Sequence, residues 1–316
     1  MITISDNIVI ANNSTILVGF SGGPDSVYLL IHLLKAVKEH KTTNIIALHL
    51  DHEWRLESKQ DAIWCQDFCA KHNVTFVTKK ASEINSTAKY NGSKEELGRK
   101  LRRQFFEQEA AKHDNSYIAL AHHQDDQLET FFIRLARGTS LSGLTGIKEV
   151  TGKYIRPLLH MRKQEILTFL QDNNISYLED KTNEDMSFLR NRIRHQLVPV
   201  LENVDDRLST HIISTMQQFQ KIDTFLDITT QNTIQTITVE KTPLSLDTKQ
   251  FLNLDIILQQ RITLSLLINA QATFTPSKAL FSEVIRFLKT GKSTQHTIHK
   301  TYQVTKDANS FSIIKR

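Results

Sequence analysis

The sequence predicts an α/β protein with a doubly wound, mainly parallel sheet, followed by a smaller α+β, largely helical domain. Short apolar runs alternate with amphipathic helical segments through residues 16–173, a pattern typical of parallel strands connected by helices. The apolar run at 44–50 is nearly continuous, as expected for a strand that is covered on both faces. This alternation ends near residue 205, so we expect domains at 1–204 and 205–316.

The first predicted strand, residues 16–20, leads into the turn Ser21-Gly22-Gly23-Pro24-Asp25-Ser26. An amphipathic helix follows, with an apolar stripe of Val27, Leu30, Ile31, Leu34 and Val37. Because glycine has no Cβ, a large anion can approach the amides of Gly22 and Gly23 closely. Pro24 suits the first helical position, and the positive helix N-terminus favours phosphate. The turn is therefore a candidate phosphate-binding loop; the alternative is a glycine-rich turn that binds no ligand.

The turn lacks the Gly-Lys-Ser/Thr of kinase and GTPase loops, because Val27 follows Ser26 and the next lysine is Lys35. We therefore expect it to bind the pyrophosphate portion of a nucleotide, with chemistry at the α-phosphate. Asp25, at the start of the helix, is a candidate for assisting Mg²⁺ or the transferred group.

Polar residues also follow two further predicted strands. Asp51 and His52 follow the strand at 44–50, and the strand at 117–121 is followed by His122-His123-Gln124-Asp125-Asp126-Gln127-Leu128-Glu129. In open α/β sheets, ligands bind at the carboxyl ends of strands. Asp125 and Glu129 are four residues apart and share a face of the next helix, whose buried stripe we expect to be Leu128, Phe131, Phe132 and Leu135. Paired carboxylates can bind Mg²⁺ or an amine, whereas stabilisation of the helix dipole would explain only one acid.

Positive charge is concentrated in three places, within a net charge of +5 over 316 residues. One helix places its basic side chains opposite a buried stripe of Leu97, Leu101 and Phe105; they are Arg99, Lys100, Arg102 and Arg103. A second cluster comprises Arg190, Arg192 and Arg194, and residues 278–316 contain eight Lys or Arg and two acids. These groups suit the phosphates of a nucleotide or of RNA, although solvated helix faces are the alternative.

In order and spacing, these motifs resemble a family of PP-loop (N-type) ATP pyrophosphatases, the tRNA(Ile)-lysidine synthetases. The resemblance extends from Ser21 to about Leu201. The turn at 21–26 is shared across the superfamily, whereas His-His-x-Asp-Asp-Gln at 122–127 and Arg-Asn-x-Ile-Arg at 190–194 are more specific. The resemblance implies a PP-loop ATPase (HUP-like) domain that uses ATP to activate carbon 2 of the wobble cytidine in the CAU anticodon of an isoleucine tRNA. Free L-lysine would then displace AMP, giving lysidine.

Together, the residue patterns and the resemblance give a set of expected roles. We expect ATP to be bound by Ser21, Gly22, Gly23, Pro24, Asp25, Ser26, Asp51 and His52, with Asp25 also the ligand of Mg²⁺. We expect lysine at Asp125, Asp126 and Glu129, and catalysis by Asp25, Asp125, Glu129 and Arg194. The residues expected to bind tRNA are Arg99, Arg102, Arg190, Arg192, Lys289 and Lys292, with 205–316 as the tRNA-recognition domain.

The chain departs from the family pattern at two places. Gly98 and Arg103 stand where the family has alanine and tyrosine, so position 103 has no aromatic ring for stacking. Asp51-His52 is followed by Glu53-Trp54-Arg55 instead of Gly-Leu-Arg. We also expect the chain to lack the additional C-terminal domain of longer relatives.

Within the second domain, the patterns predict a helix at 206–228 with an inner stripe of Leu208, Ile212, Met216, Phe219, Ile222 and Leu226. A threonine- and isoleucine-rich strand is expected at 233–239. Further helices are expected at 249–268 and 276–289, and two strands, 297–304 and 310–314, as a hairpin.

Other features of the sequence bear on the cellular location of the protein and on alternative activities. No apolar run approaches the roughly 20 residues that span a bilayer, and no basic segment followed by an apolar one opens the chain, so we expect a cytoplasmic protein with no membrane partner. A PP-loop tRNA thiolase is the second enzymatic interpretation, although a chain with only two cysteines, Cys65 and Cys69, is poorly suited to sulfur transfer. A non-catalytic RNA-binding module is the third. The oligomeric state is left open, with a homodimer as one option.

Overall fold

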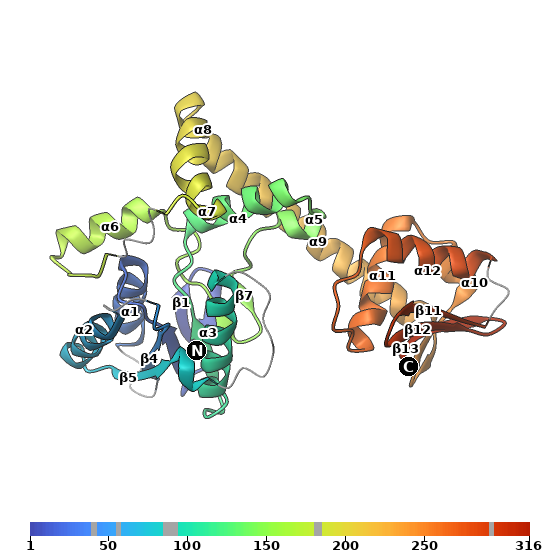
Figure 1. Cartoon of the computed structure of the whole chain (residues 1–316), viewed down its shortest axis with the longest axis horizontal. Coiled ribbons are helices and arrows are strands. Elements are labelled where there is room, and N and C mark those ends of the chain that lie inside the picture. The colour runs from blue at the N-terminus through green and yellow to red at the C-terminus, as the bar shows by residue number, and fades with distance from the viewer. Residues whose placement is uncertain (39–42, 55–57, 85–93, 180–184, 291–293) are drawn as a thin grey trace. The chain divides into compact units, whose positions relative to one another are not determined.

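The chain forms two compact units, Met1–Gln217 and Gln218–Arg316, here called the N-terminal and C-terminal units. Figure 1 shows the computed structural model, which describes all residues except 39–42, 55–57, 85–93, 180–184 and 291–293. The division falls inside the long helix α9, Leu208–Ile237, so this helix contributes to both units. The boundary predicted from the sequence, after residue 204, lies earlier along the chain.

The N-terminal unit is built on a six-stranded sheet of order β5-β4-β3-β6-β8-β7. Only β7 is antiparallel to its neighbour. The strands are β3 Thr15–Gly19, β4 Asn44–Asp51, β5 Thr75–Lys80, β6 Ser116–Ala119, β7 Val150–Thr151 and β8 Tyr154–Ile155. From β3 the chain proceeds outward through β4 and β5 and then returns to the other side of β3 as β6. The predicted doubly wound, mainly parallel sheet is confirmed, with its switch point at β3.

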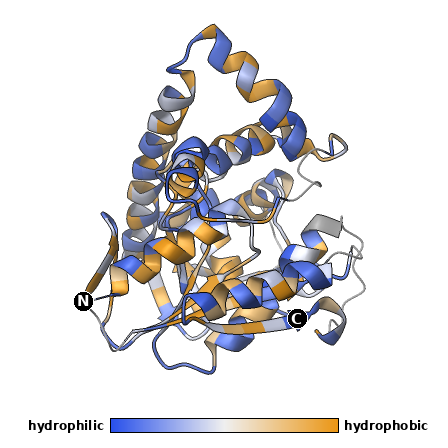
Figure 2. Cartoon of the chain, turned by 90° about the vertical axis from the view of Figure 1, so that its left-hand side faces the viewer, coloured by the Kyte–Doolittle hydropathy of each residue, from blue (hydrophilic) through white to orange (hydrophobic). Residues whose placement is uncertain are grey.

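Helices cover both faces of this sheet because side chains alternate along each strand. Ile16 and Val18 of β3 share a core with α1 Pro24–Val37, α2 Ser58–Lys71 and α6 Lys163–Asp172. Leu17 faces the other way and packs with Leu101 and Phe105 of α3, Lys94–Ala110. In Figure 2 the strands at the centre are hydrophobic, whereas helix surfaces carry both kinds of residue. Of the predicted stripe of α3, Leu101 and Phe105 are buried and Leu97 is partly buried, and the arginines of this helix are exposed.

The remaining elements of this unit surround the sheet. They are the hairpin β1 Ile2–Ser5 and β2 Ile8–Ile10, a 3-10 helix Ala81–Glu83, α4 Gln124–Arg137, α5 Leu141–Leu144, α7 Leu189–Arg192, a π-helical turn Ile193–Leu197, and α8 Val198–Val204. Helix α4 packs chiefly against α5, α7 and the π-helical turn. The prediction that Leu135 is buried was wrong, since its side chain is 52% exposed in the last turn of α4. Leu128, in the second turn, is buried as expected.

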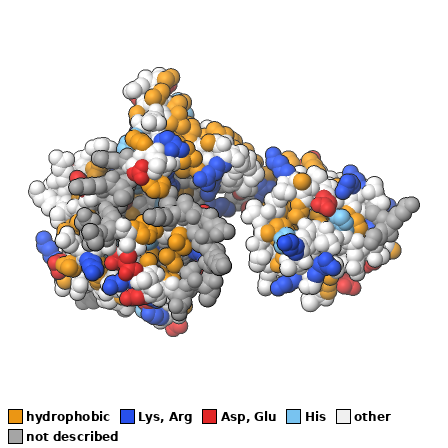
Figure 3. All heavy atoms as spheres, viewed as in Figure 1, with side chains coloured by type: hydrophobic (Ala, Val, Ile, Leu, Met, Phe, Trp, Pro, Cys, Tyr) orange, Lys and Arg blue, Asp and Glu red, His pale blue; other side chains and the backbone are white. Residues whose placement is uncertain are grey.

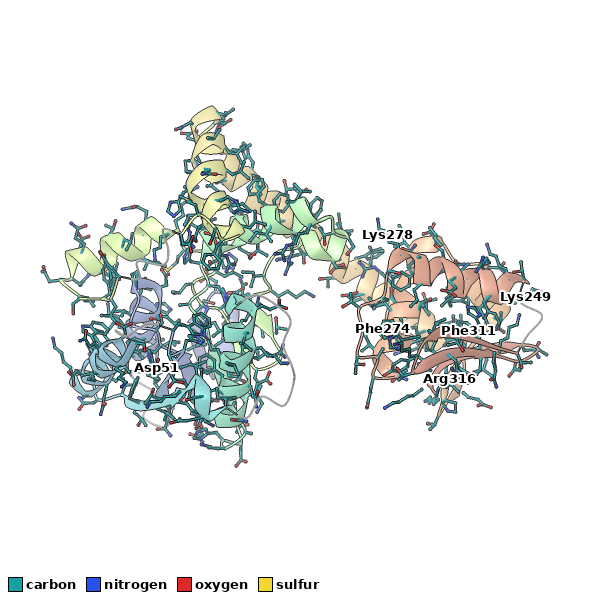
Figure 4. The ribbon with its side chains drawn as sticks, in the orientation of Figure 1. Asp51, Lys249, Phe274, Lys278, Phe311 and Arg316 are labelled. Atoms are coloured by element: carbon teal, nitrogen blue, oxygen red, sulfur yellow. The ribbon has the colours of Figure 1, made fainter. Side chains whose placement is uncertain are left out.

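The C-terminal unit is an α+β module with an antiparallel sheet of order β11-β12-β13-β10-β9. Its strands are β9 Thr238–Lys241, β10 Leu244–Asp247, β11 Gln295–His299, β12 Tyr302–Lys306 and β13 Ser310–Lys315. Its helices are α10 Thr248–Leu252, α11 Ile256–Asn269 and α12 Lys278–Thr290, together with the end of α9. The core includes Leu246 of the sheet and Ile262 and Val284 of the helices, and Phe311, labelled in Figure 4, packs on Phe251.

Several predicted elements of this region were wrong in their extent. Residues 233–237 are helical and not a strand, because threonine hydroxyls along α9 donate to carbonyls one turn earlier: Thr230 to Leu226 at 2.7 Å and Thr233 to Thr229 at 2.8 Å. The predicted helix at 249–268 is divided into α10 and α11, since the Asp255 side chain accepts from the Ile257 amide and caps a new helix. The predicted strand at 297–304 is likewise divided, between β11 and β12.

Two further observations concern the exposure of α9 and the absence of membrane-spanning helices among the described residues. Ile222, predicted on the inner stripe of α9, is 48% exposed, whereas Met216 is buried. No helix in the part of the chain that the structure describes is both long enough and apolar enough to cross a membrane.

The turn between β3 and α1 requires glycine at one position only. Gly22 has φ +79°, and a Cβ there would lie 2.7 Å from Leu178 Cδ1 and 3.0 Å from Cys65 Sγ. Gly23 has φ −70°, and a Cβ at this position would meet only Ser21 Oγ, at 3.5 Å. The fold therefore demands Gly22, whereas Gly23 leaves open space in front of the turn.

We predict that Gly22→Ala lowers the free energy of unfolding by about 1–3 kcal/mol, because it combines backbone strain with a steric clash. Gly23→Ala is the matched control and should cost less than about 1 kcal/mol. Urea unfolding of both variants measures the difference. Equal destabilisation by the two substitutions would contradict this assignment.

Candidate active site

Three polar segments meet at one edge of the N-terminal sheet. The turn at 21–26 follows β3, residues 51–54 end and follow β4, and residues 122–126 follow β6. Because β4, β3 and β6 are parallel neighbours, their carboxyl ends lie side by side. Asp51, at the end of β4, is labelled in Figure 4. The three segments that the sequence marked as candidates are thus brought together by the sheet topology.

The turn at 21–26 is held by its own hydrogen bonds. Ser26 Oγ donates to the Gly23 carbonyl at 2.9 Å and accepts from the Ser21 amide at 3.2 Å. The Leu178 amide donates to the Gly22 carbonyl at 2.9 Å. Helix α1 starts at Pro24 with no side-chain cap on its N-terminus. The amides of its first turn have no intrahelical acceptor, so the turn can bind an anion there.

His123 connects the start of α1 to the start of α4. Its buried ring lies 3.7 Å from Asp25 Oδ2, 3.4 Å from Asp125 Oδ2 and 3.6 Å from Asp126 Oδ2. Burial opposes a charge on this ring, but contact with Asp125 and the negative charges of Asp126 and Asp25 outweigh it and raise the pKa of His123. The same contacts lower the pKa of Asp125 and Asp126 despite their burial. In its protonated form, His123 offsets the charge of all three carboxylates.

Lys163 is a member of this cluster that the sequence analysis missed. Its Nζ lies 2.5 Å from Asp25 Oδ1, and its backbone amide donates to Asp125 Oδ2 at 2.8 Å. Lys163 begins α6 and is 138 residues from Asp25. The sequence offered no local signal for this contact. The structure thus provides a cation beside the turn, which itself contains no lysine.

Glu129 forms a second, separate cluster. Its side chain is buried and accepts a hydrogen bond from Arg194 Nε at 2.6 Å, while Arg190 Nε lies 2.9 Å from its other oxygen. Burial raises the pKa of Glu129, and the two arginines oppose that shift. Both arginines reach it because they are one turn apart along α7 and the π-helical turn. Glu129 and Asp125, on the same helix, therefore engage different partners.

At the end of β4, Asp51 and His52 shape a tight loop. Asp51 is buried, and its carboxylate accepts from the Glu53 amide at 2.8 Å, in a loop where Glu53 has φ +56°. His52 Nε2 lies 3.0 Å from Arg102 Nη2 of α3. Burial, and then the charge of Arg102, lower the pKa of His52 to about 4. His52 is therefore neutral at neutral pH.

The residues expected to bind tRNA lie in different surroundings. Arg99 is exposed on α3, and Arg192 is exposed but donates to the Met186 and Ser187 carbonyls at 3.0 and 2.9 Å. Lys289 is exposed in the last turn of α12, and Lys292 lies outside the described residues. Figure 3 shows Lys and Arg side chains spread over the visible face of each unit, without a single dominant patch.

The described residues contain no group of three or more His, Cys, Asp or Glu side chains placed to hold a metal ion. Asp25 already contacts Lys163 and His123. A cation at Asp25 would thus need most of its ligands from a bound substrate. Mg²⁺ is commonly held in this way, by one or two carboxylates and phosphate oxygens.

Cys65 and Cys69 are both buried in the core of the N-terminal unit. Burial raises the pKa of each thiol, that of Cys69 to about 12. Because the thiolate is the reactive form, neither cysteine is suited to sulfur transfer at neutral pH. This disfavours the thiolase interpretation.

We predict that His123 stabilises the fold in a pH-dependent way. Because its pKa is raised above the ordinary value of 6.5, its contribution is complete below about pH 6.5 and is lost as pH rises through the raised value. The measurement is the difference in unfolding free energy between the parent protein and His123→Asn, from about pH 6 to about pH 9. The difference should shrink with rising pH; a constant difference would show that the charged form is not the stabilising one.

The chain is similar to several known proteins. The tRNA(Ile)-lysidine synthase of Bacillus subtilis is 34% identical over 285 residues, covering 87% of this chain and 59% of that protein. The enzyme of the same name from Borrelia garinii is 36% identical over 246 residues, covering 77% of this chain and 54% of that protein. The chain thus spans between half and three fifths of the length of these relatives.

A solved structure of a U34-tRNA thiolase from Methanococcus maripaludis, with its [4Fe-4S] cluster, shares the fold at a TM-score of 0.56 and 18% identity, covering 67% of this chain and 74% of that one. A family model described as the PP-loop domain matches residues 3–201. That match covers more than half of the chain and includes the turn, the acid–histidine cluster and the arginine pair described above. The chain therefore belongs to the PP-loop domain family.

Proposed function

We propose that this protein is a tRNA(Ile)-lysidine synthetase. It would use ATP to join lysine to carbon 2 of the wobble cytidine in the CAU anticodon of isoleucine tRNA. The observation that supports this best is the meeting of the turn at 21–26 with the cluster of Asp25, Asp125, Asp126, His123 and Lys163 at one sheet edge. Relatives that carry this name match the chain beyond the family domain.

In the proposed first step, the cytidine O2 attacks the α-phosphorus of ATP, and pyrophosphate leaves. The free amides at the start of α1, with Ser21 and Ser26, would bind the pyrophosphate portion, and the open space at Gly23 would admit it. Lys163, which lies beside the turn in contact with Asp25, would supply a cation for these phosphates. Mg²⁺, when bound, would offset phosphate charge, with Asp25 as its protein ligand. Asp51 and His52 would form the neighbouring wall of the nucleotide site.

In the second step, the ε-amine of lysine attacks carbon 2, and the oxygen leaves with AMP. This amine has an ordinary pKa near 10.4 and must lose a proton before it attacks. Asp125 and Asp126 are ionised, because their pKa values are lowered, so they can attract the substrate ammonium. The same lowered pKa values make them weak bases, which favours solvent as the acceptor of the amine proton. The ion pairs of Glu129 support a positioning role: it would orient Arg190 and Arg194 toward the negative charge of ATP or RNA.

The proposal predicts ATP-dependent incorporation of labelled lysine into an isoleucine tRNA transcript bearing CAU. A methionine tRNA, which shares that anticodon, should remain unlabelled, and the nucleotide products should be AMP and pyrophosphate. Formation of ADP would overturn the reaction, because it places the attack at the outermost phosphorus. Absence of pyrophosphate release with tRNA present would favour a non-catalytic RNA-binding module.

We further predict that Lys163→Gln weakens ATP binding roughly 10- to 100-fold, because a charge-assisted hydrogen bond contributes about 1.5–3 kcal/mol. AMP, which lacks the pyrophosphate portion, should bind the variant and the parent equally well. Calorimetric titration with both nucleotides measures this. Lys112→Gln, which alters an exposed lysine paired with Glu109, is the matched control. Equal loss of ATP and AMP binding would indicate that Lys163 only maintains the fold.

A further inference from the structure

The two departures of this chain from the family pattern are in contact with each other. Trp54 lies in the loop after β4, and Gly98 lies in the first half of α3. A Cβ at Gly98 would lie 2.6 Å from Trp54 Cη2 and 3.1 Å from His52 Cε1. Real Cβ atoms do not approach other atoms at 2.6 Å, so an alanine here would displace the tryptophan ring. The helix-disfavouring glycine thus provides the space that Trp54 occupies.

Trp54 is held on one face of its ring and is still half exposed. Its ring stacks on the His52 ring, with centroids 4.5 Å apart and planes at 25°. Arg102 Nη2 lies 3.0 Å from His52 Nε2, so the histidine is held in turn by α3. Trp54 nevertheless remains 50% exposed. A large part of this aromatic residue is therefore accessible for contact with a ligand.

The helix beside the ring carries exposed basic side chains. Arg102, one turn after Gly98, lies 3.0 Å from His52 Nε2, and Arg99 is exposed next to Gly98. An aromatic face flanked by arginines is the combination that binds unpaired bases of RNA, in which bases stack on the ring and cations bind the adjacent phosphates. A pocket for the adenine of ATP would instead enclose most of its ligand. The exposure of Trp54 therefore favours a base of a larger, open ligand.

We propose that Trp54 is a stacking platform for an unpaired nucleobase of RNA, with Arg99 and Arg102 beside it for the phosphates. The proposal rests on the proposed function, because it assigns a contact to the tRNA substrate. It gives the pair Trp54 and Gly98 one shared role.

Tryptophan fluorescence tests whether a base of the RNA stacks on Trp54. The chain has two tryptophans, and Trp54→Phe removes the signal of one while keeping an aromatic ring, so the difference between parent and variant isolates Trp54. We expect an RNA stem-loop with an unpaired CAU loop to quench this difference signal. A duplex RNA of the same length and ATP alone should leave it unchanged. Quenching by ATP alone would overturn the proposal in favour of adenine.

Measurements of RNA-binding affinity test how much Trp54 contributes to binding. Trp54→Ala should weaken stem-loop binding about 10-fold or more, as expected for the loss of one base-stacking contact. ATP binding should fall much less, because Trp54 reaches the nucleotide site only through its stacking on His52. Trp54→Phe should largely restore binding. Gly98→Ala should cause a similar loss by displacing the ring, although alanine is the better helix former. Combined with Trp54→Ala, it should cause no further loss.

The outcomes separate the two proposals. If the parent protein modifies tRNA but Trp54→Ala binds the stem-loop as tightly as the parent does, the stacking role of Trp54 is wrong. The proposed function then still holds. Additive losses from Trp54→Ala and Gly98→Ala also overturn the stacking role, because they show that the two positions act independently. Parent protein that binds no RNA at all overturns both.

Discussion

The site depends on neutralising three carboxylates that the fold places close together. Asp25, Asp125 and Asp126 surround one imidazole, and like charges at this spacing would otherwise raise one another's pKa values and push the segments apart. A proton on His123 and the ammonium of Lys163 offset them. The starts of α1, α4 and α6 are thereby tied together, and the turn after β3 takes its place beside them.

A second charged cluster is centred on a buried carboxylate. Glu129 is buried between Arg190 and Arg194, whose side chains are about one third exposed. Removing the carboxylate would leave two arginines without their buried counter-charge, so an effect of such a change on activity would not by itself reveal a contact with substrate. The arginines hold the α4–α7 packing and still present part of their charge to solvent. Structural and functional roles coincide in these side chains.

The two units differ in what they contribute. The family match ends at residue 201, within the N-terminal unit, and both charge clusters lie before that point. The C-terminal unit has an ordinary apolar core beneath an antiparallel sheet, and the lysines and arginines on the face seen in Figure 3 are scattered. Within the N-terminal unit, Trp54 and Gly98 both depart from the pattern of the family that the sequence resembles. They are also in contact, so a departure in one segment is matched by a departure in another.

Local features could be predicted from the amino-acid sequence: the strand–turn–helix at 16–37, the alternation that gives a parallel sheet, and the spacing of Arg190 and Arg194 by one helical turn. These features depend on residues that are near one another in the chain, where periodicity and turn residues can be recognised. The predicted length of α9 was wrong, because side-chain hydrogen bonds let threonines continue a helix. The contacts of Lys163 with Asp25 and of Arg194 with Glu129, across 138 and 65 residues, could not be predicted in this way. They depend on how distant strands and helices pack together, which no local pattern encodes.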